Sequence, residues 1–245
     1  MDYRGLAEVH GVPPSATTCH RERADPSSTE AAEEASKCGS RTPFDRHGAG
    51  STPFWSGAGR GHPMSGAGEG LGKIEVRLKW DPSSWREPPR HLDIVAATYS
   101  DADRYGRPAY VVHYDSRSPD GTITMPRHST TGQGFGFVEV MTLEFDRLSS
   151  AYGRVVVGVA IHQDGGPRTF GDIRNAGVLV IEKYTELLKD DFGRVAGATA
   201  ATIAEFVRDS TGRWCMYPAI RGYDSEPAAF IAEMGRAHSL EDPSA

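Results

Sequence analysis

The sequence has no uninterrupted apolar run of about 18 residues or more, which a membrane-spanning helix would require. Its first residues, MDYRGLAEVHGVPP, also lack the basic start and the apolar core of a secretory signal peptide. We therefore expect no transmembrane segment and a cytoplasmic protein.

Cysteine is scarce, and Cys19, Cys38 and Cys215 form neither a C-x-x-C pair nor any Cys/His spacing typical of a structural zinc site. An odd number of cysteines also provides no disulfide framework, which suits a reducing compartment. The net charge of −6 lacks the basic excess typical of nucleic-acid binding. We therefore predict no structural zinc site and no nucleic-acid partner.

Isoleucine, leucine and valine are almost absent from residues 1–70, which contain only Leu6, Val9 and Val12. Such a segment cannot bury enough apolar surface to offset the entropy lost on ordering. We predict that it is a disordered, low-complexity stretch. It is either a real flexible arm or translated upstream sequence with the true start at Met64. The remainder is expected to form one folded domain and a short tail, at residues 71–237 and 238–245.

From residue 71 onward the sequence has the two-residue period of β-strands. In residues 73–80, KIEVRLKW, apolar side chains alternate with charged ones, as in a strand with one solvent-facing side. Residues 196–208 fit a helix or a strand equally well. A short helix is expected at residues 227–235, because Pro227 suits its first turn and Gly235 its C-terminal cap. Further segments of strand composition are 92–100, 109–114, 122–124, 137–145, 154–162, 177–184 and 214–220.

Seven to nine short strands separated by turns predict an all-β fold. The expected architecture is a β-sandwich of two mainly antiparallel sheets with a short C-terminal helix. The sequence shows no regular alternation of strands and helices, which argues against a dinucleotide-binding domain of the Rossmann type.

Six short segments follow one another in a characteristic order. They are Trp80-Asp81, HLDIVA at 91–96, SPDG at 118–121, TGQGFG at 131–136, FGDIRNA at 170–176 and AIRGY at 219–223. In order and spacing they resemble the TerD family of tellurium-resistance and stress proteins, over residues 73–236. The resemblance implies a cytoplasmic β-sandwich that binds calcium between acidic loops. It also implies a link to tellurite-resistance and phage-defence systems, and no demonstrated catalysis.

The calcium ligands implied by the resemblance are only partly present. Asp93, Asp115 and Glu139 retain an oxygen donor at family positions, and they are the expected metal ligands. His91 stands where the family has an aspartate, and residues 127–129, Arg-His-Ser, replace a Gly-Asp-Asn element. Calcium prefers six to eight oxygen ligands. We therefore expect either a weakened calcium site or a metal-free sandwich.

Two further readings concern the histidines. His91, His113, His128 and His162 are candidates for a transition-metal site, since imidazole suits zinc, nickel and copper. The plainer alternative is that they are ordinary buried or exposed histidines. A hydrolase site would need a set such as Ser129, His128 and Asp172, but the sequence has no G-x-S-x-G motif.

The FGDIRNA segment is either a structural latch or part of a ligand site. As a latch, Gly171 would adopt a positive φ, and Asp172 or Asn175 would bond backbone groups at the turn. Arg174 would then form an ion pair with a buried acid such as Asp93.

These features together predict a non-catalytic binding module that has protein partners and holds calcium if the weakened site still works. The alternatives are a metal-independent protein–protein scaffold within a resistance or defence complex, and a small hydrolase.

Overall fold

The computed structural model describes residues 70–236. The expectations for residues 1–69, including a start at Met64, and for the tail lie outside this range. No helix within the described range is long and apolar enough to cross a membrane.

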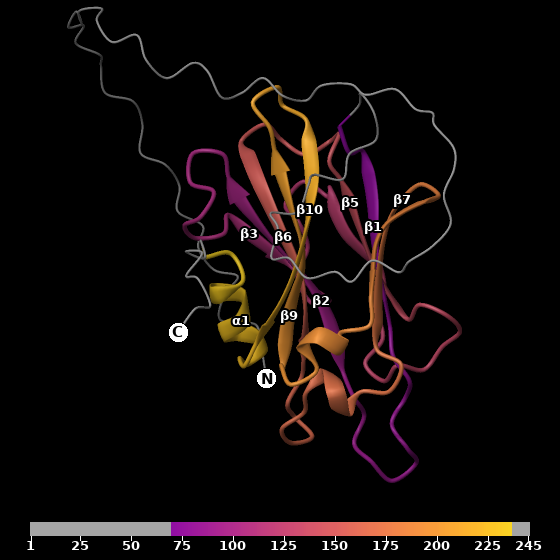
Figure 1. Cartoon of the computed structure of the whole chain (residues 1–245). Coiled ribbons are helices and arrows are strands. Elements are labelled where there is room, and N and C mark those ends of the chain that lie inside the picture. The colour runs from indigo at the N-terminus through magenta and orange to yellow at the C-terminus, as the bar shows by residue number, and fades with distance from the viewer. Residues whose placement is uncertain (1–69, 237–245) are drawn as a thin grey trace, which may run out of the picture. The chain divides into compact units, whose positions relative to one another are not determined.

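Two five-stranded sheets, in which every strand pairing is antiparallel, face each other (Figure 1). The sandwich predicted from the sequence is thus confirmed. The first sheet has the order β4-β5-β1-β7-β8, with bounds Ile123–Arg127, Glu139–Glu144, Lys73–Lys79, Gly177–Glu182 and Thr185–Asp190. The second has the order β10-β9-β6-β2-β3, with bounds Trp214–Tyr223, Ala200–Arg208, Tyr152–Ile161, Leu92–Ser100 and Tyr110–Val112.

The main core lies between the two sheets. On β1, Ile74, Val76 and Leu78 point inward and are completely buried, while the charged residues between them stay partly exposed. Their partners include Leu92, Ile94 and Phe206 of the second sheet. The alternation of β1 therefore has the physical cause inferred from the sequence, since one of its faces contacts the core and the other contacts water.

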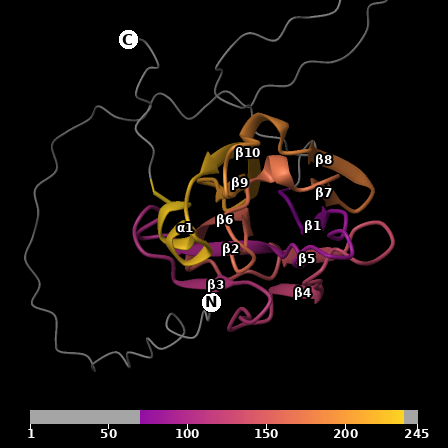
Figure 2. The same cartoon turned by 90° about the horizontal axis from the view of Figure 1, so that it is seen from below.

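The second sheet is covered on both faces. Helix α1, Pro227–Glu233, lies against the outer face of this sheet (Figure 2), where Phe230 packs with Val95 and Val156. A strand that is buried on both sides has no polar face. This arrangement explains why β2 and β6 are almost continuously apolar.

The expected elements differ from the observed ones in two strand regions, and α1 has Met234 rather than Gly235 as its C-terminal cap. The ambiguous residues 196–208 contain strand β9, preceded by a short 3-10 turn, η3 (Gly193–Val195). Strand β8, with the sequence TELLKD, was not predicted. It is an edge strand whose residues are all exposed or half-buried, so it has no clear apolar alternation.

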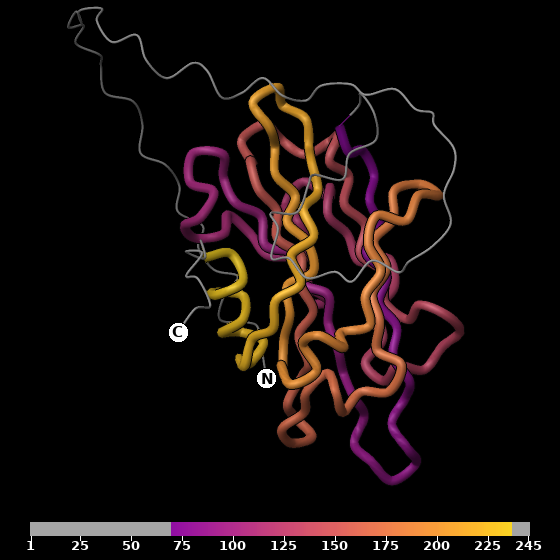
Figure 3. Tube along the Cα trace, viewed as in Figure 1, coloured from indigo at the N-terminus to yellow at the C-terminus, as the bar shows by residue number. Residues whose placement is uncertain are grey.

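The strands that position the candidate site converge at one end of the sandwich, the lower end in Figure 3. There β2 begins beside the end of β6, because Leu92 pairs with Ile161. In the other sheet β5 begins beside the end of β1, because Leu78 pairs with Glu139.

Candidate functional site

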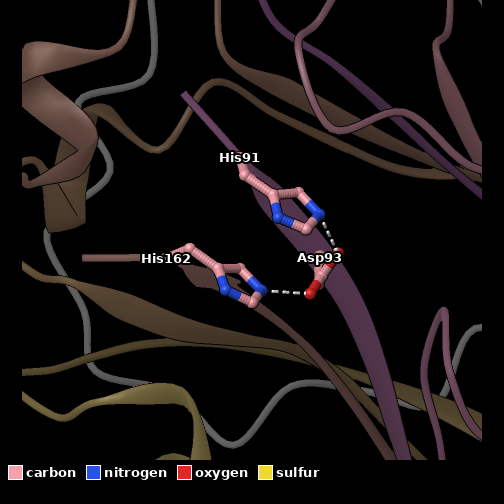
Figure 4. Close-up of side chains that lie close together, drawn as sticks. All are labelled: His91, Asp93 and His162. Atoms are coloured by element: carbon pink, nitrogen blue, oxygen red, sulfur yellow. Dashed lines mark hydrogen bonds and ion pairs between the residues drawn. The ribbon is translucent and has the colours of Figure 1, made fainter. Parts of the chain in front are cut away.

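A histidine and an aspartate on β2 meet a second histidine at the end of β6. His91 immediately precedes β2, Asp93 is its second residue, and His162 immediately follows β6. The His162 N–H donates to the His91 carbonyl at 2.9 Å, which places the two residues side by side. Their rings stack with centroids 4.0 Å apart, and the Nε2 atom of each faces one oxygen of Asp93 (Figure 4).

The other sheet contributes a carboxylate and a third histidine. Glu139, the first residue of β5, is completely buried, and its Oε1 accepts the Ile94 N–H at 2.6 Å. Its Oε2 lies 3.1 Å from Nδ1 of His128, which follows β4. The same Nδ1 is 4.0 Å from Oδ1 of Asp93, so the two halves are continuous. We call His91, Asp93, His128, Glu139 and His162 the histidine–carboxylate cluster.

The charges in the cluster are perturbed by burial and by one another. Burial raises the pKa of Glu139 to about 7, and the charge of Asp93 adds to this, against a hydrogen bond from His128. Burial also acts to raise the pKa of Asp93, but the hydrogen bond with His162 and the electrostatic attraction of His91 and His162 outweigh it, so the pKa is lowered. The hydrogen bond to Glu139 raises the pKa of His128, although burial opposes it.

Two buried atoms of the cluster make no hydrogen bond. Asp93 Oδ1 and His91 Nε2 are both fully buried and only 2.8 Å apart, yet their orientation is not that of a hydrogen bond. A buried polar atom without a partner costs about 1–3 kcal/mol. Such an atom in a folded protein calls for a ligand or another compensating group.

The expected calcium ligands are only partly brought together. Asp93 and Glu139 lie in the cluster, whereas Asp115 is exposed and belongs to neither group of residues able to hold a metal ion. The backbone N–H of Asp115 donates instead to His113 Nδ1 at 3.3 Å.

The sequence offers four histidines as candidates for a transition-metal site, and three of them converge on Asp93. The fourth, His113, is buried nearby but does not belong to either group. Burial lowers the pKa of His113, against the charges of Asp93 and Asp115. All four histidines directly flank a strand end, so their positions in the sequence alone do not separate His113 from the three that converge. Tyr114 stacks on the ring of His128 at 4.9 Å.

The residues named for a hydrolase are held in separate local contacts. Ser129 Oγ accepts the backbone N–H of Gly132 at 3.1 Å, and the Asp172 carboxylate accepts the Thr169 N–H at 2.9 Å. Neither side chain forms a hydrogen bond with His128 within the described range.

The glycine-rich segment TGQGFG covers Trp80. Gly132 has a φ of 73°, and an added Cβ would lie 2.4 Å from Trp80 Nε1. This indole N–H donates to the Arg90 carbonyl at 2.9 Å. The loop therefore packs the end of β1 against the segment that leads into the cluster.

The FGDIRNA segment makes the contacts of a latch between the end of β1 and the start of β7. Asn175 Nδ2 donates to Asp81 Oδ2 at 2.7 Å, and the Asp81 N–H donates to the Arg174 carbonyl at 2.9 Å. Asp172 closes its own turn with Thr169, at the 3-10 turn η2 (Phe170–Asp172).

Two details of the latch prediction were wrong. The residue with positive φ is Asn175, at 52°, and not Gly171. Gly171 instead lies close to the Ala196 carbonyl, which its N–H bonds at 2.7 Å. Arg174 is exposed, and the ion pairs of the buried Asp93 are with histidines, so no Arg174–Asp93 pair forms.

Replacing Asn175 with alanine should lower the free energy of unfolding by about 1–2 kcal/mol. Asparagine tolerates the left-handed conformation better than alanine, for which it costs about that much. Asn175→Gly is the matched control, because it removes the bond to Asp81 but tolerates the positive φ. Urea unfolding should show a smaller loss for glycine than for alanine. Equal losses would assign the effect to the Asp81 contact rather than to the backbone.

Comparison with known proteins supports one family throughout. The TerD domain model matches residues 58–233. The tellurium resistance protein TerD of Serratia marcescens is 23% identical over 176 residues, covering 70% of this chain and 92% of its own length. An uncharacterized protein of Bacillus subtilis is 25% identical over 179 residues, covering 68% and 89%.

Two solved structures are similar to this chain in both fold and sequence. A crystal structure described as a homologue of the telluride resistance protein TerD, from Streptomyces coelicolor, is 62% identical, with a TM-score of 0.68. It covers 69% of this chain, which matches the whole of that structure. A second crystal structure, of a protein of unknown function, is 56% identical with the same coverage and TM-score. The family match spans well over half of the sequence, and the chain belongs to the TerD domain family.

Proposed function

We propose that this chain is a non-catalytic binding module whose histidine–carboxylate cluster holds a divalent cation. The observation that carries the proposal is the pair of completely buried carboxylates, Asp93 and Glu139, at a loop end of the sandwich. Within residues 70–236 their ion-pair partners are all histidines, with no lysine or arginine among them. Buried charges are normally paired or bound to a metal.

The unbonded Asp93 Oδ1 supports the same proposal. A cation at this oxygen would offset both its desolvation and the repulsion from Glu139, which helps to raise the pKa of that residue. Relatives of this chain carry the name tellurium resistance protein. We place the module in a stress or resistance role of that kind, in which it would act with protein partners.

A metal-independent scaffold is the second candidate. Trp85 and Phe135 are 96% and 100% exposed, in the loops that lead to β2 and β5. Exposed aromatic side chains often anchor protein–protein contacts. In this case the cluster would be a structural feature, and partner binding would not depend on a cation.

Thermal unfolding of the full chain, stripped of metal with a chelator, separates the two candidates. Calcium, magnesium, manganese and zinc would be added singly. An ion present at 100 times its dissociation constant should add about 2.7 kcal/mol to the free energy of unfolding. For a domain of this size the melting temperature would rise by about 5–11 °C.

Two variants complete this experiment. Asp93→Asn should abolish the shift, whereas Asp146→Asn, which changes an exposed aspartate on the turn after β5, should retain it. If none of the ions changes the melting temperature, the cation-binding proposal is wrong and the scaffold is favoured.

A further inference from the structure

Three imidazole rings approach the buried carboxylates from three separate segments. His91 comes from the start of β2, His128 from the end of β4 and His162 from the end of β6. In each of two overlapping groups, the available ligand atoms lie within 4.8 Å of one another. The groups are His91, Asp93 and His162, and Asp93, His128 and Glu139.

This donor set does not fit calcium, the ion implied by the resemblance. Calcium takes six to eight oxygen ligands, and the two carboxylates supply four oxygens at most. One of these, Glu139 Oε1, already accepts the Ile94 N–H, and Asp93 Oδ2 bonds His162. The other side chains of the cluster offer imidazole nitrogens, which a hard cation such as calcium binds poorly.

The same donor set fits a transition metal of the zinc type. Zinc binds imidazole nitrogens and carboxylate oxygens, usually four ligands in all. The group of His91, Asp93 and His162 contains both buried atoms of the cluster that lack a hydrogen bond, Asp93 Oδ1 and His91 Nε2. A metal ion would satisfy both atoms at once, because each would become a ligand.

One neighbouring carboxylate lies near the second ring nitrogen of His162. A metal-binding histidine usually has a carboxylate or carbonyl next to its second nitrogen. Here His162 Nδ1 lies 3.9 Å from the Asp164 carboxylate. His128, held by Glu139, lies near the same Asp93 oxygen as His91, with its Nδ1 4.0 Å from Oδ1.

We propose that His91, Asp93 and His162 bind a divalent transition-metal ion such as Zn²⁺ in preference to calcium, with His128 and Glu139 beside them. The proposal rests on the proposed function and specifies its ion. His91 and His128 stand where the resemblance implies aspartates. These two replacements then account for the preference for zinc over calcium.

The test is calorimetric titration of the metal-free full chain with ZnCl₂, CoCl₂ and CaCl₂. We expect zinc and cobalt to bind at about one ion per chain, with zinc at least ~100-fold tighter than calcium. Cobalt binding should produce visible d–d absorption bands of a nitrogen- and oxygen-ligated site. His91→Asn and His162→Asn should each weaken zinc binding by at least the ~10–100-fold that loss of an outer partner costs.

His113→Asn is the matched control, since His113 is a buried histidine at the same end of the sandwich outside both groups. This variant should bind zinc as the unmodified chain does. His162 is only 8% exposed and its replacement could impair folding. A measurement on the unmodified chain therefore accompanies the variants: in imidazole ¹H–¹⁵N spectra, zinc should shift the signals of His91 and His162.

The outcomes separate the two proposals. Tight calcium binding with weak zinc binding would overturn the choice of ion but leave the cation-binding function standing. No binding of any ion would overturn both. Zinc binding that survives the His91→Asn/His162→Asn double variant, with unshifted imidazole signals, would place the ion elsewhere and overturn the site.

Discussion

Replacing Arg154 with methionine is expected to lower the free energy of unfolding by about 3 kcal/mol. The Arg154 side chain is 1% exposed, although it carries a full charge on strand β6. Its Nε and Nη2 bond Glu205 Oε2 at 3.0 and 2.9 Å, and its Nη1 donates to the Gly235 carbonyl at 2.7 Å. It thus joins the sheet to the segment that follows α1.

The magnitude follows from what the substitution leaves behind. Breaking a buried ion pair costs about 3–5 kcal/mol, because the remaining partner stays desolvated. Glu205 is 23% exposed and regains some water, which puts the cost at the lower end of that range. Methionine keeps much of the apolar stem, so the loss reflects the charge and its bonds rather than a cavity.

Urea unfolding of four proteins checks this expectation: the unmodified chain, Arg154→Met, Glu205→Gln and the double variant. The pair should show a coupling energy of about 1 kcal/mol or more, since the two residues are in direct contact. Arg154→Lys should not restore stability, because lysine cannot make the several bonds of the planar guanidinium group. A loss below about 1 kcal/mol for Arg154→Met would show that the buried network is not needed to hold the helix.

Strands β1 and β2 were well defined by the sequence, the first by its alternation and the second by its apolar run. Strand β1 alternates because each of its faces has a single environment, and β2 is mostly apolar, apart from Asp93, Thr98 and Ser100, because α1 covers its outer face. Strand β8 could not be recognised, since its stability comes from pairing with β7 and not from its own apolar face. Helix and strand were undecided at residues 196–208 because a doubly covered strand has no two-residue period.

The candidate site could be predicted only in part. The resemblance identified Asp93 and Glu139 from their positions in family motifs, and both belong to the cluster. It could not identify His162, which lies 69 residues from Asp93 and reaches it only through the pairing of β2 with β6. The sequence also could not decide whether a nearby histidine repels a cation or binds it. A histidine binds a cation only when an unprotonated ring nitrogen faces it, and the orientation of the ring is known only from the fold.

Replacing Gly158 with alanine is expected to cost about 3 kcal/mol, the upper end of the range for overpacking a core. Gly158 lies on β6, directly below the ring of Phe230 from α1. An added Cβ would lie 2.5 Å from Phe230 Cζ and 2.8 Å from the Ala201 carbonyl oxygen. The ring can move only by lifting the helix, and the carbonyl belongs to the paired strand β9, so neither contact is easily relieved.

Gly197→Ala is the matched control, because an added Cβ there meets no atom within 4 Å and its φ is ordinary. Chemical unfolding should show little change for this control. Combining Gly158→Ala with Phe230→Leu should recover part of the lost stability, since leucine has no atom at the position of Cζ and the two sites are in contact. If the double variant is no more stable than Gly158→Ala, the clash is with the Ala201 carbonyl. In that case the strand, rather than the helix, requires glycine at this position.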